Sequence, residues 1–134
     1  MPAVVRLENL EVGFHSTLLS IENLEISSGE ILAVTGPSGI GKTSLLRTIS
    51  GLLRPVSGLV QVDGVRSPDR PRRGTIGYIP QKLGLVRHSS VWANVMLGSR
   101  AARSSSDSKE RAVNSITAMG LEEKKYESVK RLSG

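Results

Sequence analysis

The stretch Gly36–Thr43, GPSGIGKT, decides how the rest of the chain is interpreted. It fits the pattern Gly, four residues, Gly-Lys-Ser/Thr of phosphate-binding loops. Its glycines lack Cβ, so the backbone can take positive φ and approach a ligand closely, and its N–H groups can surround phosphate oxygens. The pattern places Lys42 on the β- and γ-phosphates and the Thr43 hydroxyl on Mg²⁺. Ser44 opens the next helix and could contact the α-phosphate. We therefore predict a site for a triphosphate.

The sequence on either side of this loop has the arrangement that the motif requires. Ile31–Val34 is a continuous apolar run, which is typical of a strand buried on both faces. Apolar residues follow the loop at helical spacing, at Leu45, Leu46, Ile49, Leu52 and Leu53. Strand, glycine loop and helix in this order predict a ligand-binding loop. The alternative, a glycine-rich turn without a ligand, leaves this context unexplained.

Composition restricts the possible classes of protein. The 134 residues suffice for one ordinary domain, and the absence of cysteine excludes disulfides and thiolate metal sites. No apolar run approaches membrane-spanning length, and no signal peptide is visible, so we expect a cytoplasmic chain. The formal net charge of +6 suits an anionic partner. Four arginines, Arg66, Arg70, Arg72 and Arg73, lie in a proline-containing loop without interleaved aromatic residues, so a solvated loop is favoured over a nucleic-acid surface.

The first two-thirds of the chain is predicted to be rich in strands. Alternating apolar residues predict two antiparallel strands before the loop, over 5–12 and 19–26, with a bulge at Glu22-Asn23. A short strand at 59–62 ends in the hairpin signal Asp63-Gly64. This turn argues against Asp63 as a Mg²⁺ ligand. Thr75–Ile79 is predicted to be a further strand, with Gln81 just beyond it.

The last third is predicted to be helical. A helix capped by Ser89 or Ser90 should run through Leu97, and 99–108 should be an exposed linker. Asp107 and Glu110 suggest a capping box for a helix that ends near Gly120, and 121–131 suggests a last, charged helix. The isolated histidines, His15 and His88, have no metal-ligand partners nearby in the sequence and are expected at the surface.

With these motifs in order, nearly the whole chain resembles an ATP-binding subunit of the ATP-binding cassette (ABC) transporter family. GPSGIGKT resembles its Walker A loop, Gln81 in YIPQ its Q-loop, and Leu85–Gly98 the start of its helical subdomain. Leu132-Ser133-Gly134 matches the first three residues of its LSGGQ signature. Phe14 lies where the family has an aromatic residue that stacks on adenine. The residues alone are equally compatible with stacking and with a core position.

The resemblance implies an α/β fold, a partial P-loop NTPase core with an antiparallel β subdomain and the start of a helical subdomain. It implies a core over 1–84 and a helical part over 85–134. It implies ATP and Mg²⁺ as ligands, with Thr43 and Gln81 as metal ligands. The implied nucleotide-binding residues are Phe14, Gly36, Pro37, Ser38, Gly39, Ile40, Gly41, Lys42, Thr43, Ser44 and Gln81.

The implied partners are transmembrane permease subunits and a second cassette in a head-to-tail dimer. This would place the chain on the inner face of the plasma membrane, and nucleic acid is not favoured as a partner. The parent protein would be a transport ATPase, with a small-substrate importer favoured. Two alternatives stay open: a soluble cassette ATPase that acts on nucleic acid or ribosomes, and a non-catalytic remnant.

The sequence ends within the signature and contains no apolar strand followed by Asp-Glu and no switch histidine. We therefore assign no catalytic residue. We expect a truncated cassette, whether a gene fragment, a frameshifted copy or an incomplete sequence. Because phosphoryl transfer depends on positioning and charge stabilisation, this stretch should bind a nucleotide better than it hydrolyses one.

Overall fold

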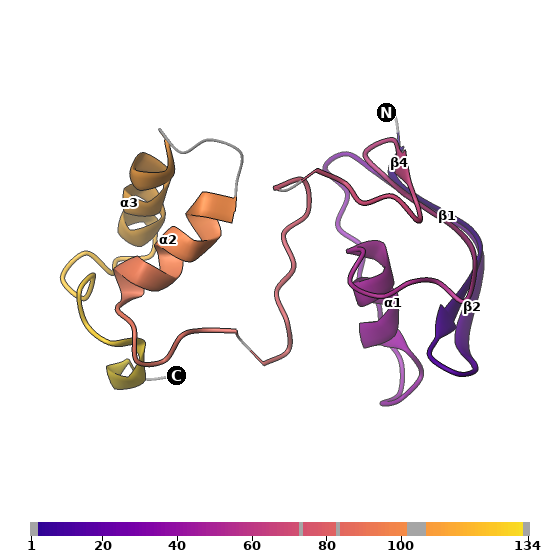
Figure 1. Cartoon of the computed structure of the whole chain (residues 1–134), viewed down its shortest axis with the longest axis horizontal. Coiled ribbons are helices and arrows are strands. Elements are labelled where there is room, and N and C mark those ends of the chain that lie inside the picture. Colours follow the sequence, from indigo (N-terminus) through magenta and orange to yellow (C-terminus); the bar gives the residue numbers. More distant parts are fainter. Residues whose placement is uncertain (1–2, 73, 83, 102–106, 133–134) are drawn as a thin grey trace. The chain divides into compact units, whose positions relative to one another are not determined.

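The computed structural model describes residues 3–72, 74–82, 84–101 and 107–132. The chain forms two compact units, Met1–Arg72 and Arg73–Gly134 (Figure 1). The first unit carries the sheet and the phosphate-binding loop, and the second carries two packed helices. The functional boundary that we place between residues 84 and 85 remains a prediction.

The first unit contains a four-stranded antiparallel sheet in the order β2-β1-β3-β4 (Figure 1). Its strands are β1 (Ala3–Gly13), β2 (Thr17–Ser27), β3 (Ser57–Val62) and β4 (Val65–Arg66). The hairpin expected before the loop is thus confirmed. The turn at Asp63-Gly64 is confirmed too, with Val62 paired to Val65 and positive φ at both turn residues.

A kink in β1 sets which side chains reach the core. Leu7, Leu10 and Val12 are all fully buried, although strict alternation would put positions 7 and 10 on opposite faces. Asn9 lies between them with φ 46°, and the pairing of β1 with β3 shifts register between Glu8 and Glu11. The predicted bulge at Glu22-Asn23 is wrong, because β2 pairs with β1 in one register there. The irregularity belongs to β1 where it faces β3.

Helix α1 (Lys42–Ile49) covers one face of this sheet and contacts β1 and β3 (Figure 1). Its buried residues, Ser44, Leu45 and Thr48, lie at helical spacing. They meet Val60 and Val62 of β3, each 5% exposed, together with the buried residues of β1. This small core holds the start of α1 in place, directly after the GPSGIGKT loop.

Two predicted strands are absent from the described residues. Ile31–Val34 has no strand pairing, and Ile31 is 95% exposed. Thr75–Ile79 is likewise unpaired, and Ile79 is 82% exposed. A strand exists only where a neighbour satisfies its N–H and C=O groups, and no described segment pairs with either run. Gln81 therefore follows an irregular segment and not the expected strand.

The second unit is built on α2 (Val91–Ala101) and α3 (Ser108–Ala118), which pack against each other. Its buried residues are Val91, Met96, Ser108, Ala112 and Ile116. The predicted exposed linker at 99–108 is wrong at both ends, because Ser99 lies in α2 and Ser108 is 2% exposed. The Ser99 hydroxyl donates to the Ser108 carbonyl. Residues 102–106 lie outside the described residues.

The sequence predicted the end of α3 correctly but not the way in which its start is capped. At the start, Asp107 occupies the cap position without a capping hydrogen bond from its side chain, so the predicted capping box is wrong. Its carboxylate lies 3.9 Å from the Arg111 guanidinium. At the end, Gly120 N–H donates to Thr117 O and Leu121 N–H to Ile116 O, which confirms the predicted helix stop.

The predicted helix at 121–131 is wrong, because this segment forms turns and one 3-10 turn, η1 (Val129–Arg131). Its carbonyls are used by α2 instead. Val91 N–H donates to Glu127 O at 3.0 Å, and Trp92 N–H donates to Lys125 O at 2.9 Å. The first N–H groups of a helix have no partner inside the helix, so this tertiary pairing competes with local helix formation.

Candidate functional site

The GPSGIGKT loop has the backbone that a phosphate cradle requires. Gly36, Gly39 and Gly41 all have positive φ, at 148°, 87° and 107°. Residues with Cβ rarely adopt this region, so the glycines are needed for the observed path of the chain. Residues 36–40 are exposed, which leaves one side of the loop accessible.

Lys42 closes the loop on itself. Its ammonium donates to the carbonyl oxygens of Gly36 at 2.7 Å and Pro37 at 2.6 Å. The charge is therefore held at the opening of the loop by two backbone acceptors. No carboxylate of the described residues pairs with Lys42, so its charge remains available to a polyanion.

The start of α1 adds a second feature that favours anions. Gly41 is its N-cap residue and provides no side-chain cap, and the first turn contains no acidic residue. Free N–H groups at a helix start carry partial positive charge and bind phosphate. Farther along, Thr48 Oγ1 donates to Ser44 O at 2.8 Å, and both residues are buried. Thr43 is exposed at the first turn, while Ser44 is 8% exposed and faces the core.

The β1–β2 hairpin packs against the end of the loop. A Cβ placed on Gly41 would lie 3.3 Å from the Cβ atoms of both Leu18 and Leu19. These residues lie near the start of β2, four and five positions after Phe14 in the hairpin turn. Phe14 is 60% exposed, so the core position that the residues alone left open is excluded. An aromatic face is therefore accessible in the turn of a hairpin that contacts the loop.

This contact with Leu18 and Leu19 was not predicted. Nothing in the local pattern distinguishes these two residues from other apolar residues of a strand. The usable signal was the third loop glycine, Gly41, whose missing side chain implies a close neighbour.

The remaining candidate residues belong to the second unit. Gln81 is exposed, and Leu132 is partly exposed just after η1. Ser133 and Gly134 lie outside the described residues. The structure thus brings Gly36–Ser44 and the Phe14 hairpin together in one unit, while Gln81 and Leu132 belong to the other.

Within the second unit, the segment after Gln81 is hydrogen-bonded to the segment that leads to Leu132. Ser128 Oγ and Lys130 N–H both donate to Arg87 O at 2.9 Å, and Val129 N–H donates to Ser89 O at 3.0 Å. Ser90 and Ser128 form an antiparallel bridge. Two stretches about forty positions apart therefore form one local framework, which the sequence did not predict.

Asn94 joins the same framework through its side chain. Its amide donates to Val86 O at 3.1 Å and to Ser90 O at 3.0 Å, and its Oδ1 accepts from Val86 N–H at 2.8 Å. The ammonium of Lys125 lies 4.2 Å from the centre of the Trp92 ring. No helix among the described residues is both long enough and apolar enough to cross a membrane.

A glycine loop that enters a helix beside an antiparallel sheet defines an α/β protein of the P-loop NTPase type. A family model described as ABC transporter matches residues 19–134. The chain therefore belongs to the ABC transporter family, and the predicted fold class and family are confirmed.

Curated relatives agree with this assignment. The chain is 39% identical over 142 residues to the methionine import ATP-binding protein MetN of Helicobacter pylori strain HPAG1, covering 98% of this chain and 43% of that protein. It is 33% identical to the phosphonates import ATP-binding protein PhnC 2 of Halalkalibacterium halodurans, covering 98% and 61%. The chain thus spans about half the length of these relatives.

Solved structures support the same fold. One is a dimeric ATP-binding cassette in a post-hydrolysis state bound to ADP and Pi, with 27% identity and a TM-score of 0.76, covering 96% of this chain and 63% of that one. Another is cbiO1 from Clostridium perfringens, described as part of the ABC transporter complex cbiONQ. It has 25% identity and a TM-score of 0.75, and the match covers 99% of this chain and 57% of that one.

Proposed function

We propose that this chain is the nucleotide-binding part of an ABC transporter ATP-binding subunit and that it binds Mg-ATP at the GPSGIGKT loop. The observation that carries this proposal is the Lys42 ammonium, held at the mouth of a positive-φ glycine loop beside an uncapped helix start. These are the two elements that bind polyphosphate through backbone N–H groups and one compact charge.

In this proposal the loop residues 36–41 surround the phosphates, and Lys42 binds the β- and γ-phosphates. Thr43, at the exposed first turn of α1, supplies a hydroxyl ligand to Mg²⁺. Phe14 stacks on the adenine, which its exposed face in the adjoining hairpin supports. We keep Gln81 as a proposed Mg²⁺ ligand because it matches the family's Q-loop glutamine. Bound Mg²⁺ would neutralise phosphate charge.

We assign nucleotide binding, and not hydrolysis, to this stretch of residues. Hydrolysis in a cassette needs an acidic residue that orients water, and none of the residues above has that chemistry. We propose that the Leu132–Gly134 fragment serves the nucleotide of a second cassette in a head-to-tail dimer. The dimeric structural relative supports the pairing of two cassettes.

Relatives that carry import in their names favour an importer of a small substrate. We propose permease subunits as the membrane partners, which would hold the chain at the cytoplasmic face of the membrane. The relative described as part of a transporter complex supports such an attachment.

Nucleotide binding tests the proposal directly. We expect Lys42→Ala to raise the dissociation constant for Mg-ATP about tenfold or more, since a charge-assisted contact contributes about 1.5–3 kcal/mol. Isothermal titration of the 134-residue chain at fixed ionic strength measures the change.

Lys109→Ala is the matched control, because Lys109 is an exposed lysine on α3 in the other unit. It removes the same charge and should leave the affinity unchanged. Equal Mg-ATP affinity in the wild type and in Lys42→Ala would contradict the proposal.

A further inference from the structure

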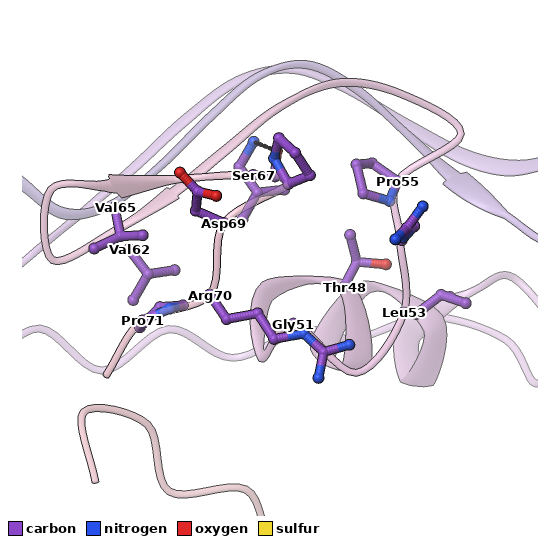
Figure 2. A pocket seen from close by; sticks show the side chains of 13 residues that line it. Thr48, Gly51, Leu53, Pro55, Val62, Val65, Ser67, Asp69, Arg70 and Pro71 are labelled. Atoms are coloured by element: carbon purple, nitrogen blue, oxygen red, sulfur yellow. Dashed lines mark hydrogen bonds between the residues drawn. The ribbon is translucent and has the colours of Figure 1, made fainter. Parts of the chain in front are cut away.

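A pocket lies at the end of α1 opposite the phosphate-binding loop, and the proposed nucleotide site does not use it (Figure 2). It has a volume of about 70 Å³. The last turn of α1 and the loop after it form one side, where Thr48, Gly51 and Leu53 lie. The β3–β4 hairpin, with Val62 and Val65, and the loop after it enclose the other side.

The inner wall of this pocket is formed by buried side chains, two of them valines, and its rim is charged. Val60, Val62 and Thr48 are at most 5% exposed, so they form a fixed inner surface. Arg54, Asp69 and Arg70 line the same pocket but are exposed. A ligand that fits here would combine a short aliphatic part with a charged end.

The two arginines have no partners in the described part of the chain. Neither the Arg54 nor the Arg70 guanidinium makes an ion pair or side-chain hydrogen bond there, although Asp69 lines the same pocket. The neighbouring Arg66 differs, since its Nε donates to Gln61 Oε1 at 3.1 Å. Two guanidinium groups and one carboxylate give the rim one net positive charge.

The charge of the rim, more than the size of the pocket, selects the class of ligand. One water molecule needs about 10–15 Å³ of such a cavity, so this space has room for a group of carboxylate or phosphate size. The guanidinium fork matches both groups with two parallel hydrogen bonds. We propose that this pocket binds a compact anion, a carboxylate or a phosphate monoester that carries a short aliphatic group.

Two features make this binding weak. The Asp69 carboxylate repels an anion, and the carboxyl end of α1 adds partial negative charge. We therefore expect a dissociation constant in the millimolar range. The first feature gives a prediction: removal of the Asp69 charge should strengthen anion binding, whereas removal of either arginine should weaken it.

The test is an NMR titration of the ¹⁵N-labelled 134-residue chain with sodium isobutyrate and, separately, with inorganic phosphate, at constant ionic strength. The titrations use the Lys42→Ala background, so that phosphate binding at the GPSGIGKT loop does not obscure the result. We expect saturable shifts at the amides of Gly51, Val62, Val65 and Asp69. Saturation with only one of the two probes would assign the pocket to that class of anion.

Single-charge variants connect the shifts to the pocket. Arg54→Gln and Arg70→Gln should each weaken binding about tenfold, and Asp69→Asn should strengthen it about twofold. Arg47→Gln is the matched control, because Arg47 is an exposed arginine of α1 that does not line the pocket. It should leave the dissociation constant unchanged.

The proposal is overturned if neither probe gives saturable shifts at the pocket amides, or if Arg70→Gln and Arg47→Gln have equal affinity. Should Arg70→Gln lose its dispersed spectrum, Arg70→Lys replaces it: weaker binding supports the proposal, and unchanged affinity overturns it. Nucleotide binding at Lys42 is measured independently, so the two proposals fail separately.

Discussion

At the scale of single residues, Gly41 connects the phosphate-binding loop to the sheet. It is buried, has φ 107°, and has Leu18 and Leu19 3.3 Å from where its Cβ would lie. Gly39 also has positive φ, at 87°, but no atom lies within 4 Å of its Cβ position. A substitution at Gly39 therefore tests the cost of backbone strain alone, and one at Gly41 tests strain together with the contact to β2.

We expect Gly41→Ala to lower the free energy of unfolding by about 2 kcal/mol, because strain adds to the contact with β2. Gly39→Ala should cost about 1 kcal/mol, because only the strain applies. Urea denaturation followed by circular dichroism compares the two variants. Equal losses would show that the contact with Leu18 and Leu19 contributes no stability.

The same scale shows what the sequence could predict about the site. The path of the loop, from Gly36 to Lys42, follows from the residue types themselves, since glycine spacing dictates where φ is positive. The exposure of Phe14 and the kink at Asn9 depend on contacts between distant strands. A local pattern contains no information about such contacts.

At the scale of elements, the start of α2 combines local and tertiary capping. Ser90 Oγ accepts from Ala93 N–H at 3.1 Å, as the sequence predicted for one of the two serines. The N–H groups of Val91 and Trp92 bind carbonyls of the 125–127 segment instead. The first helical N–H groups are thus satisfied by two different means.

We expect Ser90→Ala to destabilise the second unit by about 1 kcal/mol, the usual cost of losing a serine cap. Ser89→Ala is the control, since the structure uses Ser89 through its backbone carbonyl. It should change stability by less than about 0.5 kcal/mol. Thermal unfolding followed by Trp92 fluorescence reports on this unit. If both variants behave alike, Ser90 is not the cap.

Elements with local causes were predicted correctly, and those with distant causes were not. The β1–β2 hairpin, α1, the Asp63-Gly64 turn and the end of α3 follow from alternation, helical spacing and turn residues. The apolar runs at 31–34 and 75–79 also suit strands, but pairing needs a second segment. Segment 121–131 does not form the expected helix, because carbonyls of this segment accept hydrogen bonds from the start of α2.

At the scale of the whole molecule, the two unpaired apolar runs predict how a longer chain should behave. Ile31 and Ile79 are 95% and 82% exposed, and the matched part covers only 43% of the MetN relative. Each run has the composition of a buried strand, and no strand among the described residues pairs with its backbone N–H groups. Residues from the remaining length of such a protein are the natural source of partners.

We expect the amides of Ile31–Val34 to exchange with solvent at least about tenfold more slowly once this chain is joined to the remaining residues of MetN. Hydrogen exchange followed by mass spectrometry compares the two chains. The amides of β1 serve as the internal reference, since this strand is paired on both sides here and should stay paired in the longer chain. Unchanged exchange at Ile31–Val34 would contradict a role for these residues as a strand.

The bonds from Lys42 to Gly36 O and Pro37 O have a consequence for any measured affinity. The ammonium already donates to two carbonyl oxygens, so an arriving polyphosphate must compete with them for these hydrogen bonds. The observed association constant then reports an exchange of partners and understates the strength of the new contact. A Lys42→Ala variant would lose both the contact with the polyphosphate and the two hydrogen bonds to Gly36 O and Pro37 O. Its loop would then have to keep its shape without these two bonds.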